Sequence, residues 1–126
     1  MADYRSILDK ATAEAKDFVN NPSRMDALLI QLEEKLRQVP AIGETVSGLP
    51  VMIAMVKSWI KKEYEVSPKV LAIMAGAFLY LIKKKDLIPD SIPVIGIADD
   101  VAVLGLALKL VEKDVQAYRE WRDANK

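Results

Sequence analysis

Four aspartates gather within fifteen positions of the C-terminal half of the chain, around the segment DLIPDSIPVIGIADD. They are Asp86, Asp90, Asp99 and Asp100. Carboxylate oxygens are the ligands that Mg²⁺ and Ca²⁺ prefer, so the four could together form a divalent-cation site. Their spacing does not match an EF-hand loop, in which the ligands alternate around a glycine.

The same carboxylates have a structural use. Asp86 and Asp90 can accept hydrogen bonds from backbone N–H groups at turns, and aspartates in the first turn of a helix are favoured by its macrodipole. A helix that begins near Ile97 would place Asp99 and Asp100 in that first turn. We therefore predict structural capping for all four aspartates and no bound metal, with a metal site as the alternative.

The composition excludes several kinds of chemistry. The chain has 126 residues and contains neither Cys nor His, which excludes a thiolate nucleophile, an imidazole-activated serine and a His/Cys zinc site. No glycine-rich phosphate loop or cofactor motif is present, so we predict no catalytic residue, no cofactor and no enzyme. Eighteen basic residues balance eighteen acidic ones, and this balance argues against nucleic-acid binding.

A basic and aliphatic stretch precedes and enters the aspartate segment. Lysines at a helix C-terminus complement its dipole, and lysines beside exposed aliphatic side chains are also typical of a membrane-surface anchor. Ile88 and Ile92 each precede a proline, which favours an extended backbone. We predict that the aliphatic residues cover the open end of two helices, or else contact a partner. The predicted interaction surface is Lys83, Lys84, Lys85, Leu87, Ile88 and Ile92.

The elements that must position this segment are all helical, because helical spacing of apolar residues recurs and strict alternation is absent. We predict helices over residues 3–19, 22–38, 49–63, 68–84 and 97–122, with Asn21 and Ser67 at helix starts. Lys35 is expected on a solvated face. The fold class is thus all-α, a compact bundle of about five helices in one domain, residues 1–126.

The fourth and fifth helices are expected to form a central apolar hairpin. Ala72 and Gly76 lie on the fourth helix, and Ala98, Ala102 and Gly105 lie near one side of the fifth. Glycine inside a helix costs up to about 1 kcal/mol relative to alanine, so it usually has a packing reason. We therefore predict close antiparallel packing of these two helices. The long apolar seam of the fifth helix could also serve a dimer.

The stretch YLIKKKDLIPDSIPVIGIADDVAVLGLAL resembles the signature of the YkvA-like family (DUF1232). The matching positions are Tyr80, Leu81, Asp86, Leu87, Ile88, Pro89, Asp90, Pro93, Gly96, Asp99 and Asp100. The resemblance implies a small helical domain of unknown function, with a family-like core over about residues 66–111 and members described as membrane-associated. Lys84 and Lys85 stand where many members have a proline and an apolar residue, which implies a longer and more basic helix end.

These observations predict a non-catalytic helical module that binds a protein partner or docks peripherally on an anionic membrane surface. A metal-dependent protein and a small regulator or immunity-type protein are the alternatives. The N-terminus has no apolar run, and the longest uncharged segment, Val70–Ile82, is shorter than the roughly 20 residues that span a bilayer. We therefore expect a cytoplasmic protein, with a peripheral position at the membrane as the variant.

Overall fold

The computed structural model describes residues 4–38, 48–83 and 93–125, apart from the side chains of Tyr4, Lys83 and residues 93–101. Within these residues every regular element is an α-helix, which confirms the all-α class. The helices are α1 (Tyr4–Glu14), α2 (Lys16–Val19), α3 (Pro22–Gln38), α5 (Leu49–Ile60), α6 (Pro68–Lys83), α7 (Pro93–Leu110) and α8 (Glu112–Ala124).

Local capping determines where two of these helices begin. The side-chain Oδ1 of Asn21 accepts a hydrogen bond from the backbone N–H of Arg24 at 3.2 Å, and Pro22 opens α3. The Oγ of Ser67 accepts one from the N–H of Val70 at 3.3 Å, and Pro68 opens α6. Both predicted helix starts are confirmed.

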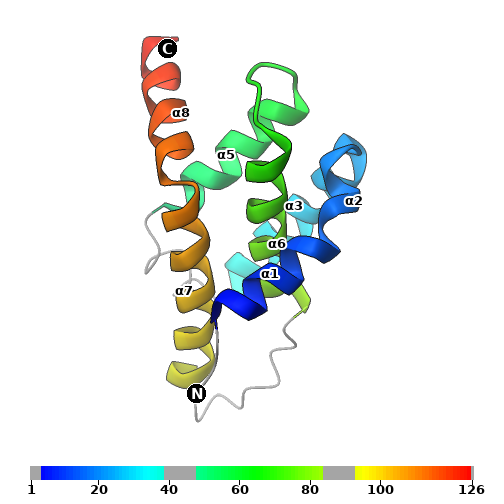
Figure 1. The fold of residues 1–126 in the computed structure, drawn as a ribbon, viewed down its shortest axis with the longest axis vertical. Helices are drawn as coiled ribbons and strands as arrows, with labels where there is room; N and C mark the ends of the chain where they lie inside the picture. The colour runs from blue at the N-terminus through cyan, green and yellow to red at the C-terminus, as the bar shows by residue number, and fades with distance from the viewer. Residues whose placement is uncertain (1–3, 39–47, 84–92, 126) are drawn as a thin grey trace.

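Two of the predicted helices are each divided in two, which explains why the described helices outnumber the prediction. The first is interrupted at Ala15 and the fifth at Val111. Val111 has φ −110° and ψ 15°, outside the helical range, yet its N–H still reaches the carbonyl of Ala107 at 3.1 Å. The two helices α7 and α8 therefore continue one another as a bent pair along one edge of the molecule (Figure 1).

Helix α6 lies at the centre of the packing, in contact with α1, α2, α3 and α7. Its side chains Met74, Phe78 and Leu81 are fully buried. A helix that is apolar on every side needs neighbours on every side, and the surrounding helices provide them. The sequence prediction of a central fourth helix agrees with this burial.

The predicted close hairpin of α6 and α7 is not confirmed. The two helices touch, but α6 makes its more extensive contact with α1 (Figure 1). A Cβ added at Gly76 would lie 2.7 Å from both the Cα and the N of Thr12 on α1, whereas a Cβ at Gly105 would meet nothing within 4 Å. The glycine of α6 thus admits the backbone of α1, and the glycine of α7 faces open space.

Candidate functional site

The predicted interaction surface falls almost entirely on residues that the structure does not describe. Lys83 is the last residue of α6, and its side chain lies outside the description. The same holds for the remaining members of that surface and for two of the predicted capping aspartates. These residues are Lys84, Lys85, Asp86, Leu87, Ile88, Asp90 and Ile92. Their predicted roles therefore stay predictions.

Asp99 and Asp100 are not in the first turn of their helix, as the sequence had predicted. Helix α7 begins at Pro93 instead of Ile97, and no acidic residue occupies its first turn. The two aspartates belong to the second turn, where the favourable effect of the helix dipole has fallen off. The early start has a local reason, because Pro93 is well suited to the first position of a helix.

The fold places the two helices that flank residues 84–92, which contain most of the predicted interaction surface. The C-terminal end of α6 and the N-terminal end of α7 both lie toward one end of the molecule, opposite the turn between α5 and α6 (Figure 1).

A buried lysine stabilises the end of α6 and was missed by the sequence analysis. The Lys35 residue of α3 is only 9% exposed, and its ammonium group donates a hydrogen bond to the backbone carbonyl of Leu81. Leu81 belongs to the last turn of α6, whose carbonyls lack partners within the helix. Lys35 lies seven residues after Leu28 and three after Leu32, so it falls on the buried stripe of α3. That spacing was the available signal.

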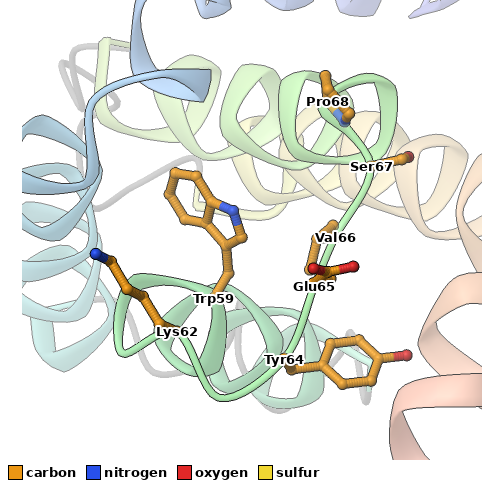
Figure 2. A pocket seen from close by; sticks show the side chains of 7 residues that line it. All are labelled: Trp59, Lys62, Tyr64, Glu65, Val66, Ser67 and Pro68. Atoms are coloured by element: carbon orange, nitrogen blue, oxygen red, sulfur yellow. The ribbon is translucent and has the colours of Figure 1, made fainter.

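The opposite end of the molecule carries a hollow of about 680 Å³. It lies at the turn between α5 and α6 and is lined by Trp59, Lys62, Tyr64, Glu65, Val66, Ser67 and Pro68 (Figure 2). The side chains do not converge on a common point: the Trp59 indole extends toward α6, whereas Lys62 and Tyr64 extend to opposite sides. The Ser67 hydroxyl already caps α6. This arrangement offers no nucleophile paired with a base.

Tyr64 belongs to a packing cluster on α8. Its ring centroid lies 5.0 Å from the ring of Tyr118, and 5.0 Å from that of Trp121. Burial raises the pKa of the Tyr64 phenol, and the nearby Asp114 carboxylate and Tyr118 raise it further. The phenol therefore stays protonated at neutral pH, and it serves packing here.

The turn that follows α5 has an unusual residue at its centre. Lys62 adopts φ 63°, in the left-handed region. The N–H of Lys62 bonds to the Trp59 carbonyl at 3.0 Å, and the N–H of Glu63 bonds to the Ser58 carbonyl at 2.9 Å. These two bonds form a Schellman motif, in which glycine is the usual left-handed residue.

The described residues give no further sign of metal or membrane-spanning chemistry. Within them, no three acidic side chains come together in a group that could hold an ion. The side chains of Asp86, Asp90, Asp99 and Asp100 are not among those that the structure describes, so the metal alternative is untested. Across the described helices, none is both long enough and apolar enough to cross a bilayer.

Comparisons with known proteins agree with this picture. Residues 70–106 match the family described as "Protein of unknown function (DUF1232)". The "Uncharacterized membrane protein YkvA" of Bacillus subtilis (strain 168) is 35% identical over 78 residues, which cover 61% of this chain and 74% of that protein. No solved structure matches the chain. The matched region runs from α6 into α7, where the resemblance was noted, and the chain belongs to the YkvA-like DUF1232 family.

Proposed function

We propose that this chain is a non-catalytic helical module that docks peripherally on an anionic membrane surface through the segment between α6 and α7. The observation that carries the proposal is the composition of that segment. Lys83, Lys84 and Lys85 directly precede Leu87, Ile88 and Ile92. Cations next to aliphatic side chains are the combination that binds the interface of a negatively charged membrane.

The position of the segment supports this reading. The end of α6 and the start of α7 lie toward the same end of the molecule, away from the α5–α6 turn and from the C-terminal end of α8 (Figure 1). The Bacillus subtilis relative is named a membrane protein. Peripheral docking accounts for such a name without requiring a helix that crosses the bilayer.

Liposome co-sedimentation tests the proposal. Vesicles of phosphatidylcholine with phosphatidylserine should pellet the protein, and vesicles of phosphatidylcholine alone should pellet much less. Each lysine near an anionic surface contributes about 1 kcal/mol. The triple change Lys83→Gln, Lys84→Gln and Lys85→Gln should therefore weaken binding by at least about tenfold.

A matched control removes the same charge from the other end of the molecule. Lys61, Lys62 and Lys69 are exposed near the α5–α6 turn, and their combined change to Gln should leave vesicle binding nearly unaltered. Equal pelleting of the wild type and of the Lys83–Lys85 variant would contradict the membrane proposal and favour a protein partner. Helicity measured by circular dichroism verifies that both variants are folded.

A divalent-cation site on Asp86, Asp90, Asp99 and Asp100 is the second candidate. It gains support from the early start of α7, because Asp99 and Asp100 do not fall in the first turn of their helix. Thermal melts with Mg²⁺, Ca²⁺ or Mn²⁺ test it: the melting temperature should rise in the wild type and not in Asp90→Asn or Asp99→Asn. An unchanged wild-type melting temperature argues against the site.

A further inference from the structure

The outer surface of α7 and α8 carries a ridge of side chains between two hollows. Lys109, Glu112 and Gln116 are exposed and follow one another at helical spacing, so they form a ridge. A hollow of about 360 Å³ lies on one side and another of about 700 Å³ on the other. The first hollow is also lined by Gly105, Leu108, Val115 and Arg119, and the second also by Leu110, Lys113, Asp114, Ala117 and Glu120.

Two charged residues of this surface, Glu112 and Arg119, have no ion pair within the described part of the chain. The Nε of Arg119 is inaccessible to solvent and has no hydrogen-bond partner there. No ion pair to Glu112 is found among the described residues either. Arg119 also lines the first hollow, so an acceptor that a partner places in this hollow would lie beside its side chain.

The arrangement of the two charges selects the kind of partner. Glu112 and Arg119 both line the first hollow and are seven residues apart, or about 10 Å along a helix. A purely acidic partner would be repelled by Glu112, and a purely basic one by Arg119. A partner must instead present a cation and an anion at this spacing in the opposite order.

We propose that this partner is a second copy of the same chain, bound antiparallel along α7 and α8. A twofold axis that passes between the two copies, level with Val115 and Gln116, places Glu112 of each copy opposite Arg119 of the other. Such an interface is self-complementary, as twofold symmetry requires. The ridge of one copy then fits a hollow of the other, which is the ordinary geometry of helix packing.

Apolar side chains on the same surface add to this interface. Leu110 is 39% exposed and lies in the second hollow, and Leu108 is half-buried in the first. The apolar seam on which a dimer was first expected is not available, because Leu104, Val111, Val115 and Tyr118 are buried in the core of the chain itself. The surface proposed here lies beside that seam and leaves the core intact.

Sedimentation velocity over a concentration series of the full chain tests the proposal. The wild type should pass from monomer to dimer as its concentration rises. Glu112→Arg alone, or Arg119→Glu alone, places like charges opposite one another twice and should raise the dimer Kd by about tenfold or more. The double exchange of Glu112→Arg with Arg119→Glu restores opposite charges and should restore the dimer.

Control reversals keep the test specific. Glu65→Arg and Lys69→Glu change exposed residues near the α5–α6 turn and should leave the dimer Kd unchanged. Circular dichroism identifies any variant that has not folded. A wild type that stays monomeric at its highest soluble concentration would overturn the proposal, and so would a folded double-exchange variant that fails to associate. Vesicle binding through the segment after Lys83 is read separately, so it can fail without affecting this result.

Discussion

Gly76 on α6 and Gly105 on α7 look alike in the sequence, since each interrupts an apolar helix, yet the structure uses them differently. A Cβ at Gly76 would lie 2.7 Å from backbone atoms of Thr12 on α1, so only glycine permits that crossing. A Cβ at Gly105 would meet nothing within 4 Å. One glycine lies in the closed centre of the fold and the other on its open edge.

The comparison shows that a glycine within a helix marks a position without a side chain. It does not reveal whether a neighbouring segment requires that space. At the α1–α6 crossing the obstacle is backbone, which cannot move aside without a change in how the two helices pack. At the edge formed by α7 and α8 there is no obstacle. The same residue type therefore stabilises tertiary packing in one region and only costs helix propensity in the other.

The strongest test of this contrast places the same side chain at both glycines. Gly76→Val should destabilise the fold by about 3 kcal/mol, because overpacking against an immovable backbone is at the upper end of its usual cost. Gly105→Val, the matched control, should change stability by less than about 0.5 kcal/mol. Urea unfolding at a low, fixed protein concentration measures both. Similar losses in the two variants would contradict the distinction between a closed and an open region.

Lys35 belongs to the closely packed region around α6, where it contacts the helix from α3. Lys35→Met keeps most of the side-chain length but removes the donor that reaches the Leu81 carbonyl. The cost should be about 2 kcal/mol, because a buried carbonyl in the last turn of α6 loses its partner. Lys10→Met, at an exposed position of α1, is the control and should be nearly neutral. Equal unfolding midpoints in urea for Lys35→Met and the wild type would show that this hydrogen bond does not contribute to stability.

A smaller gain is expected on the open edge. Gly105→Ala should stabilise the chain by about 1 kcal/mol, since alanine is favoured over glycine in a helix and the added methyl group meets nothing. Urea unfolding of this variant should show a higher midpoint with an unchanged slope. A loss of stability would mean that the surface around Gly105 is covered in solution.

The smallest effect is expected at Lys62, which occupies a position in the turn after α5 where a glycine is usual. Lys62→Gly should raise the free energy of unfolding by about 0.5–1 kcal/mol, as the left-handed conformation with φ 63° costs a lysine more than a glycine. The neighbouring change Lys61→Gly, at a residue with φ −79°, should destabilise slightly. Thermal unfolding of the pair distinguishes backbone strain from loss of charge.

Sequence reasoning succeeded where the cause is local. The bounds predicted for the second helix agree with those of α3, Pro22–Gln38, because Asn21, Pro22 and the apolar stripe act within a few turns. It failed at the start of α7, where Pro93 opened a helix four residues before the expected Ile97. A proline can end one segment or begin the next, and its own neighbours do not decide between the two.

The candidate site was predicted with less success than the fold. The family and its signature segment were identified correctly from Tyr80 onward. Lys35, in contrast, was assigned to solvent because of its charge, although its spacing from Leu32 placed it on the buried stripe. Charge was given more weight than periodicity, and the Leu81 carbonyl that compensates for the buried ammonium lies 46 residues away in the chain.

By itself the sequence determined that the chain is helical, where its capped helices begin and to which family it belongs. These properties arise from hydrogen bonds and periodicities that span a few residues. Only the tertiary structure decided that α1 crosses α6 at Gly76, that Lys35 is buried, and that Gly105 stays open. Each of these depends on which surfaces meet, and that is set by packing between segments distant in the chain.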